Sequence, residues 1–379
     1  MTFPAHRKQL QVEGDNYKQT VLALRAFANE ILFDDNSRTV LQSGSVHCGR
    51  KMTTSEANRR SKNTDVHPDL VICQSKTYGV IAEAKFGFDT DPQILSRLID
   101  ETVEQLEKYD DDLEGWPGQK TISHDLVLLI NHEDARRVAR ELKTRQGSGN
   151  FQMVRKFAII SIVRSERATG VWPVLDLETG DLSDANKTTK LQDRLPIRPD
   201  LLARNPHVGL VELYDEAPPL PVLMDLIHKA IASNLTPDEY EQYNVEGHVD
   251  KTVDMRQLRS WLSEYAFKKS DGRDPAIPKP DWIPKAIVAF VKMGWAERKP
   301  SGKESFIYHH KKGRKNYNDP YGRFVEFCAK KLAEADERAR RKSEREKSKS
   351  AKRRETDKKK LPLLADQIDK EGTLGYKGN

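Results

Sequence analysis

Residues 67–86 read HPDLVICQSKTYGVIAEAKF and carry the clearest structural pattern in this chain of 379 residues. Two short apolar runs, 69–73 and 80–86, flank the connector QSKTYG at 74–79, which is rich in turn-forming residues. Runs of this length around such a connector are typical of an antiparallel β-hairpin. We therefore expect two paired strands here.

The second run of this hairpin carries two charged residues on one face. Side chains alternate between the faces of a strand, so Glu83 and Lys85 point to the same side, together with Ile81. The opposite face is apolar and is formed by Val80, Ala82, Ala84 and Phe86. A charged pair inside an apolar strand is unfavourable unless both charges are compensated. A bound metal ion and a phosphate would compensate them.

Phosphodiester hydrolysis requires an acidified water, neutralised phosphate charge and a stabilised leaving oxygen. Two carboxylates can hold a hard cation such as Mg²⁺ or Mn²⁺, which prefers oxygen ligands and keeps bound waters. Asp69 and Glu83 come from neighbouring predicted strands and would supply these carboxylates. Lys85 would orient or deprotonate the attacking water, or stabilise the developing negative charge.

Pro68-Asp69 followed by Glu83-Ala84-Lys85 resembles the motif of the PD-(D/E)XK nuclease superfamily, which includes restriction endonucleases, Holliday-junction resolvases and RecB-like exonucleases. The resemblance implies that Asp69 and Glu83 bind the metal and that Lys85 is catalytic. It covers about 45 residues directly, or about 150 when the surrounding order of elements is included. The position of the motif on a predicted hairpin makes it more specific than the short pattern alone.

A second motif lies on the predicted helix that follows the hairpin. Residues 105–109, QLEKY, resemble the QxxxY motif of RecB-like members, which implies that Gln105 and Tyr109 assist catalysis. A spacing of four places both side chains on one helical face, able to reach the same phosphate or metal-bound water. In the simpler alternative, Tyr109 is a core aromatic residue and Gln105 a surface residue.

The superfamily often adds an acidic residue from its first helix. Residues 13–33 have helical periodicity, with Tyr17 and Leu24 on the apolar stripe. Glu13 is expected on this stripe, whereas Glu30 points about 100° away from it, so Glu13 is the preferred third metal ligand. The alternative is that Glu13 only interacts with the helix N-terminus.

Residues 1–165 are predicted to form an α/β domain. A helix at 92–109 follows the hairpin, and strands at 125–131 and 157–164 enclose a helix at 133–145. Strand, helix and strand in this order favour a crossover connection within one sheet. The resemblance implies a restriction-endonuclease-like mixed sheet flanked by helices.

Three further regions follow this domain. Residues 166–250 are an irregular connector or an extension of the sheet. Residues 251–315 have the order helix, helix, hairpin, which is expected of a winged-helix-like domain. Residues 316–379 form a C-terminal helix and a basic tail that is either a solvated helix or disordered. In the first domain, residues 43–66 are expected to be a long polar loop.

The positive charge of the chain is concentrated in its tail. The net charge is +6, while residues 331–360 contain 14 Lys or Arg and 7 Asp or Glu, so the rest of the chain is slightly negative. Phosphate contacts in the folded regions must therefore come from local groups of cations. The candidates in the polar loop are Arg50, Lys51, Arg59, Arg60 and Lys62. The candidates in the winged-helix-like region are Lys285, Lys292, Lys299, Lys303, His309, His310, Lys311 and Lys312.

The composition argues against a membrane or secreted protein. No apolar run approaches the roughly 20 residues that span a bilayer, and the first residues lack the apolar region of a signal peptide. The three cysteines, Cys48, Cys73 and Cys328, lie far apart without metal-binding spacing, which favours free thiols. We expect a cytoplasmic protein.

These features favour a Mg²⁺- or Mn²⁺-dependent DNA endonuclease. The resemblance suggests a bacterial restriction or anti-phage defence system, possible partner subunits of a defence complex and no membrane partner. Cutting both strands with one site per chain favours a homodimer. The alternatives are a nuclease acting on RNA or repair intermediates, and a nucleic-acid-binding regulatory or assembly subunit with a nuclease-like fold.

Overall fold

The computed structural model describes residues 1–34, 39–40, 45–54, 65–87, 92–117, 122–167, 170–192, 216–265, 278–298, 305–311 and 320–372. Internal contacts divide the chain into two compact units. One unit is Gln11–Phe324, and the other combines Met1–Leu10 with Val325–Asn379.

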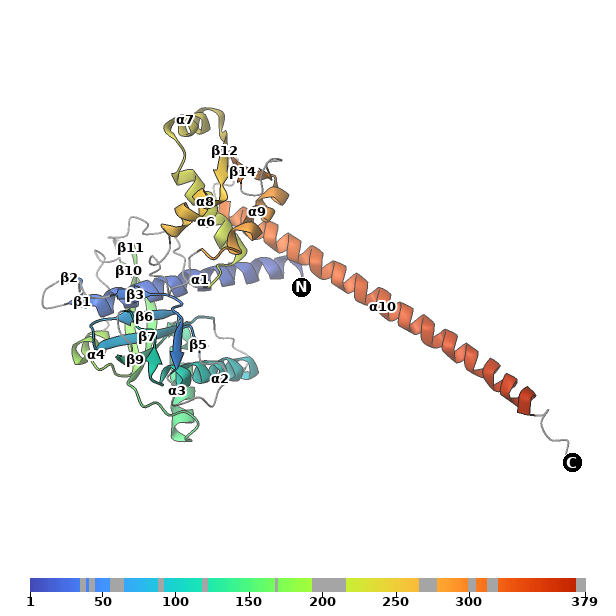
Figure 1. Cartoon of the computed structure of the whole chain (residues 1–379), viewed down its shortest axis with the longest axis horizontal. Helices are drawn as coiled ribbons and strands as arrows, with labels where there is room; N and C mark the ends of the chain where they lie inside the picture. The colour runs from blue at the N-terminus through green and yellow to red at the C-terminus, as the bar shows by residue number, and fades with distance from the viewer. Residues whose placement is uncertain are drawn as a thin grey trace. The chain divides into compact units, whose positions relative to one another are not determined.

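A six-stranded mixed sheet organises the N-terminal part of the larger unit, with strand order β11-β10-β9-β7-β6-β3 (Figure 1). The strands are β3 (Ser45–His47), β6 (Leu70–Cys73), β7 (Tyr78–Lys85), β9 (Ser123–Asn131), β10 (Phe157–Arg167) and β11 (Gly170–Gly180). The central strands β7, β9 and β10 are parallel, and the outer pairings are antiparallel. The predicted α/β class with a mixed sheet flanked by helices is confirmed.

The predicted hairpin is confirmed as β6 and β7. Val71 pairs with Ile81 in antiparallel register, and the amides of Gln74 and Ser75 donate to the Tyr78 carbonyl in the connecting turn. Gly79 suits this turn because an added Cβ would lie 2.7 Å from the Ile72 carbonyl oxygen. The hairpin therefore depends on a close backbone approach that a larger residue would disturb.

Two helices provide the predicted crossovers between the parallel strands. Helix α2 (Pro92–Tyr109) connects β7 to β9 through the short strand β8 (Leu113–Glu114), and α3 (His132–Gly147) connects β9 to β10. Both helices pack on the sheet face that carries Glu83. The core on this face includes Ile81, Leu106, Tyr109, Leu126, Leu128, Val138 and Ile159. Both faces of β7 are thus buried along most of its length.

The first helix, α1 (Phe3–Leu32), begins ten residues before the predicted start. The predicted polar loop is wrong for residues 45–54, which contain β3 and the short strand β4 (Met52–Thr54). Strand β4 pairs with β5 (Asp65–Val66) and β8, and Met52 is fully buried. Residues 55–64 lie outside the described part of the chain. A two-stranded pair, β1 (Phe33–Asp34) and β2 (Thr39–Val40), follows α1.

Residues 170–180 extend the main sheet, because β11 pairs antiparallel with β10. Helix α4 (Ala185–Gln192) follows and packs on β11.

A second group of elements spans residues 220–311. Its helices are α6 (Leu220–Ser233), α7 (Pro237–Glu246), α8 (Met255–Ser263) and α9 (Trp282–Met293). Its strands are β12 (His248–Asp254), β13 (Ala296–Arg298) and β14 (Ser305–Lys311), which form an antiparallel sheet of order β12-β14-β13. Aromatic rings fill its core. Phe290 packs edge to face on Tyr308, and Trp295 packs edge to face on Tyr308 and on Phe324.

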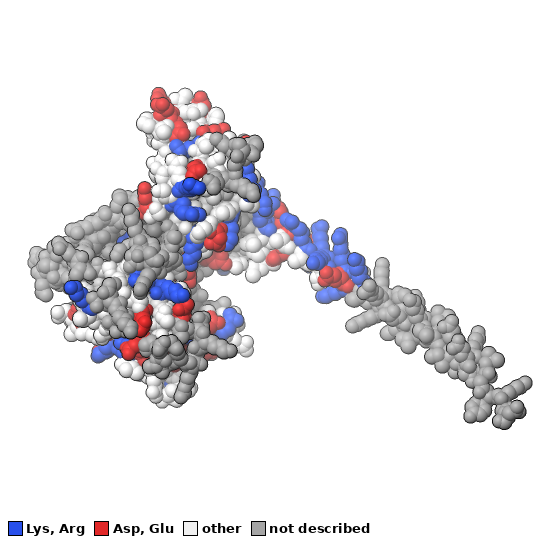
Figure 2. All heavy atoms as spheres, viewed as in Figure 1, with Lys and Arg blue, Asp and Glu red and all other residues white. Residues whose placement is uncertain are grey.

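The C-terminal region forms one helix, α10 (Pro320–Gly372), so the helical alternative for the tail holds across these residues. Its exposed charges pair along the helix, for example Lys331 with Glu334 at 2.9 Å and Arg341 with Glu337 at 2.8 Å. Figure 2 shows basic and acidic side chains close together along the described part of this helix. Such pairs stabilise a helix that has little apolar surface to bury.

None of the described helices combines the length and the apolar character needed to cross a bilayer.

Candidate metal centre

Asp69 and Glu83 meet where β6 begins beside β7. Asp69 immediately precedes β6, and its Oδ2 accepts a hydrogen bond from the Ala84 amide at 2.8 Å. Only 8% of Asp69 and 2% of Glu83 are exposed. The backbone hydrogen bond fixes the Asp69 carboxylate against β7, so two buried acids share one side of the hairpin.

Lys85 completes the predicted group of three. Its Nζ donates to Glu83 Oε1 at 2.7 Å, and its side chain is 32% exposed. The same-face placement predicted from strand alternation is therefore correct. Since the carboxylates are buried and the ammonium reaches solvent, a ligand approaching from solvent would meet Lys85.

The Gln105 and Tyr109 side chains reach the same group from α2. The Tyr109 hydroxyl donates to Glu83 Oε2 at 3.0 Å and accepts from Gln105 Nε2 at 2.8 Å. Tyr109 is 1% exposed and belongs to the main core. The two interpretations of Tyr109 are thus compatible, because its ring packs in the core while its hydroxyl holds Glu83.

Burial raises the pKa of Asp69 well above its usual value, and the negative charge of Glu83 raises it further. The charge of Lys85 and the Ala84 amide oppose this shift without cancelling it. Two buried acids and one amine carry an excess negative charge when both acids are ionised. The site therefore favours uptake of a positive charge, either a proton or a cation.

The neighbouring groups respond to the same negative field. Burial lowers the pKa of Lys85, but the charges of Glu83 and Asp69 outweigh burial, so the net shift is upward. The pKa of Tyr109 is also raised, chiefly by burial and next by the Glu83 charge. Lys85 thus remains an ammonium and Tyr109 remains a hydrogen-bond donor near neutral pH.

This donor set fits a hard divalent cation. Asp69 and Glu83 offer carboxylate oxygens, the ligand type that Mg²⁺ and Mn²⁺ prefer. A bound cation would remove the repulsion that raises the pKa of Asp69. The two acids can therefore hold Mg²⁺ or Mn²⁺, with Lys85 beside it.

Glu13 is exposed on α1, although helical geometry places it on the side of the buried stripe. Leu10, Gly14 and Tyr17 are buried on α1, whereas Glu13 is exposed. Four residues separate Glu13 from buried Tyr17, which corresponds to about 40° around the helix, so helical periodicity alone did not predict the exposure of Glu13. Its role as a metal ligand stays a prediction. Glu30, the rejected alternative, is buried and pairs with Lys190 at 2.6 Å.

Glu216 is an acid near the site that the sequence did not indicate. Its charge raises the pKa values of both Asp69 and Lys85. It precedes α6 in a segment without regular periodicity and lies more than 130 residues after Glu83. The negative field of the site thus includes a carboxylate that only the tertiary structure reveals.

Two of the predicted phosphate contacts in residues 43–66 have other partners. Arg50 is 2% exposed, and its Nε donates to the Gly115 carbonyl at 2.7 Å, so its predicted phosphate role is wrong. Lys51 is exposed and pairs with Asp65 at 2.7 Å. The remaining candidates, Arg59, Arg60 and Lys62, lie outside the described residues.

The candidate cations of the second group also separate into accessible and inaccessible residues. Lys285 and Lys292 are exposed on α9. His310 is buried, so its prediction as a surface contact is wrong, and His309 binds Asp250 at 2.7 Å. Lys299, Lys303 and Lys312 lie outside the described residues, and the side chain of Lys311 is not described.

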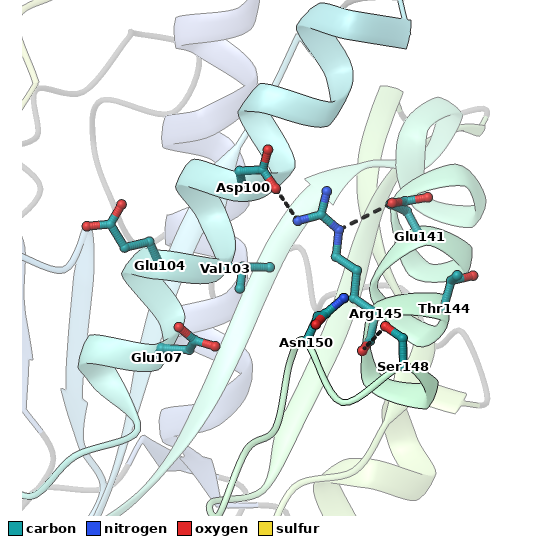
Figure 3. Close-up of a pocket in the computed structure, with 9 residues that line it drawn as sticks. All are labelled: Asp100, Val103, Glu104, Glu107, Glu141, Thr144, Arg145, Ser148 and Asn150. Carbon is teal, nitrogen blue, oxygen red and sulfur yellow. Dashed lines mark hydrogen bonds and ion pairs between the residues drawn. The ribbon is translucent and has the colours of Figure 1, made fainter.

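A surface depression of 330 Å³ borders the Gln105 and Tyr109 end of the site and also includes His67 and Lys108. A larger depression of 570 Å³ lies between α2 and α3 (Figure 3). There Arg145 contacts Asp100 of α2 and Glu141 of α3. Its acidic lining and internal ion pairs suit the association of the two helices rather than phosphate binding.

Comparisons with protein-family models, with curated proteins and with solved structures found no significant match to this chain.

Proposed function

We propose that this chain is a metal-dependent nuclease of the PD-(D/E)XK type that hydrolyses DNA phosphodiester bonds. The observation that carries the proposal is the convergence of Asp69, Glu83 and Lys85, with a 2.7 Å contact between Lys85 and Glu83. Buried acids that repel each other beside a partly exposed ammonium suit a site that takes up a cation and a phosphate.

The residues divide the chemistry among them. Asp69 and Glu83 would hold Mg²⁺ or Mn²⁺, which supplies an acidified water and neutralises phosphate charge when bound. The Lys85 ammonium reaches solvent and is placed to donate to a phosphate oxygen as negative charge develops there. Tyr109 keeps Glu83 oriented through its hydroxyl.

The second group of elements supports a nucleic-acid substrate. The order α6, α7, β12, α8, α9, β13, β14 with sheet order β12-β14-β13 resembles that of a winged helix with one additional helix, α7, after the first. Arg256 and Arg259 on α8 and Lys285 and Lys292 on α9 are exposed. We propose that these cations contact phosphates and that the basic residues of α10 add attraction independent of sequence.

The biological setting is proposed on the family resemblance alone. A bacterial restriction or anti-phage defence endonuclease, acting as a homodimer in the cytoplasm with or without partner subunits, agrees with that resemblance. RNA and branched or single-stranded DNA are alternative substrates for the same centre.

Nicking of supercoiled plasmid tests the proposal. We expect the full chain to cut with Mg²⁺ or Mn²⁺ and not with EDTA, and Asp69→Asn and Lys85→Met to reduce the rate by at least about 100-fold. Asp125→Asn is the matched control. Asp125 is also a buried acid, but it accepts hydrogen bonds from Ser183 away from the centre.

Two results would count against this mechanism. Equal nicking by wild type and Asp69→Asn would show that the acid is not part of the reaction. DNA binding without cleavage in any metal would favour a regulatory or assembly subunit.

A further inference from the structure

A second group of metal-binding side chains lies at the other end of the same sheet. His132 is the first residue of α3, and Asp176 and Glu178 lie on β11. One donor atom from each residue lies within 4.8 Å of the donor atoms of the other two. An imidazole and two carboxylates therefore converge from separate elements.

A β-bulge in the β10–β11 pairing lies at the position of Glu178. Ser161 pairs with Asp176, but the register shifts between Ile159 and Ile160, so Glu178 is an extra residue on β11. Bulges commonly redirect a side chain beside a functional site. Here the Glu178 Oε1 accepts from the Ser161 hydroxyl at 2.7 Å and lies 3.3 Å from His132 Nδ1.

This group is separate from the Asp69 and Glu83 centre. The strand registers place Lys85, Ile130, Ser161 and Asp176 in one row across β7, β9, β10 and β11. Three strand spacings separate the ends of the row, which corresponds to roughly 14 Å. One ion cannot bridge the two groups, so each must be judged by its own ligands.

The burial of the three residues leaves the group open on one side. Asp176 is 3% exposed, and the Glu178 side chain is 10% exposed, whereas the His132 side chain is 39% exposed. Two carboxylates held this close while shielded from water are stabilised by positive charge beside them. The exposed His132 side of the group is open to an ion and to water ligands.

We propose that His132, Asp176 and Glu178 bind a divalent transition-metal ion such as Zn²⁺ or Mn²⁺. One imidazole and two carboxylates give three protein ligands, the number found in open zinc sites, and leave further positions for water. Donor atoms of a tetrahedral site lie about 3.4 Å apart, so a small rotation of these side chains would close the set. The ion would join the start of α3 to β11.

Zinc titration by calorimetry tests the site in a full-length chain whose first centre is disabled by Asp69→Asn and Glu83→Gln. In this background we expect one Zn²⁺ to bind per chain. His132→Ala and Glu178→Gln should each weaken binding by more than the 10- to 100-fold typical of outer-shell partners. The His132 side chain is 39% exposed, which favours folding of His132→Ala, and Glu178→Gln keeps the size of the nearly buried Glu178 side chain. His248→Ala, at an exposed histidine, is the matched control and should leave affinity unchanged.

A second readout detects histidine ligation directly. Co²⁺ bound in the same background should give a visible spectrum that His132→Ala removes and His248→Ala preserves. Absence of Zn²⁺ binding by the background chain would overturn the proposal. Unchanged Zn²⁺ affinity in both His132→Ala and Glu178→Gln would overturn it as well. Neither result depends on nuclease activity, so this site and the nuclease proposal can fail separately.

Discussion

Tyr109 illustrates how one residue can serve the core and the site together. Its ring is buried in the core beneath α2, while its hydroxyl joins Gln105 to Glu83. Because its pKa is raised by burial and by Glu83, the hydroxyl stays protonated and remains a donor to the carboxylate. The orientation of Glu83 therefore depends on α2 as well as on β7.

Replacing Tyr109 with Phe should separate these two roles. The ring would still fill the core, but Glu83 Oε2 would lose its donor, so we expect Mn²⁺ affinity at the first centre to fall by about 10-fold or more. Folding stability should fall by only about 1–2 kcal/mol, the usual effect of one lost hydrogen bond to a charged group. Calorimetric Mn²⁺ titration and thermal denaturation measure the two quantities.

Tyr78→Phe is the matched control for this variant. Tyr78 also donates its hydroxyl to a buried acid, Asp125, so the same chemical group is removed from a similar environment. Its loss should reduce stability without changing Mn²⁺ affinity. Equal loss of affinity in both variants would mean that Tyr109 acts only through general stability.

At this scale the sequence predicted some site residues better than others. Asp69, Glu83 and Lys85 could be placed together because strand alternation fixes side-chain direction within a hairpin. The exposure of Glu13 could not be predicted, because Glu13 lies within about 40° of buried Tyr17 around the helix and only tertiary packing decides which of the two is covered. The burial of Arg50 depends on its contact with Gly115, which is distant in sequence.

Elements with clear periodicity were predicted well. Helix α2 spans 92–109 as expected, and the main-sheet strands agree with their apolar runs within a few residues. Strands β3 and β4 were missed because three residues are too few to establish alternation. Their structure comes from pairing with distant strands, as the β3 register with β6 illustrates.

The packing of α6 against β14 gives a prediction about pH. His228 on α6 stacks on His310 of β14 at 4.7 Å and forms a 2.8 Å hydrogen bond with the Tyr308 hydroxyl. Burial lowers the pKa of His228 to about 3, with further lowering by the charges of His310 and Lys229. Burial also lowers the pKa of His310. Both histidines are therefore neutral in the folded protein.

The sign of the pH effect follows from this depressed pKa. The stability contribution of neutral His228 is complete above the unfolded pKa of about 6.5 and is lost as the pH falls toward 3. We expect His228→Gln to reduce the pH slope of unfolding free energy between pH 6 and 4 by about 1.4 kcal/mol per pH unit. Denaturant titrations across this range measure the slope.

The control for this slope is His248→Gln, because His248 is exposed at the start of β12. Its slope should match that of the wild type. An unchanged slope in His228→Gln would contradict the assignment of His228 as a neutral buried residue in the folded state.

Across the whole chain, the sequence predicted which residues are candidates for a site more clearly than it predicted which residues lie beside them in the fold. The tail contains the basic excess, so the net charge of +6 gave no information about the sheet. The run VLDLE at 174–178 carries acids two residues apart in an apolar strand, which is the same signal as Glu83 and Lys85. Its convergence with His132 could not be predicted, because it requires the β10–β11 pairing and the bulge within it.

The most direct test of the central claim is an anomalous X-ray map of the full chain crystallised with Mn²⁺. We expect a peak bonded to the carboxylates of both Asp69 and Glu83 at about 2.0–2.2 Å, with the Lys85 ammonium beside it. A peak at His132, Asp176 and Glu178 would be distinguished by its ligands, two of which lie on β11, three strands away from β7. A map with no peak at Asp69 and Glu83, and with the Lys85–Glu83 ion pair intact under saturating Mn²⁺, would contradict the account.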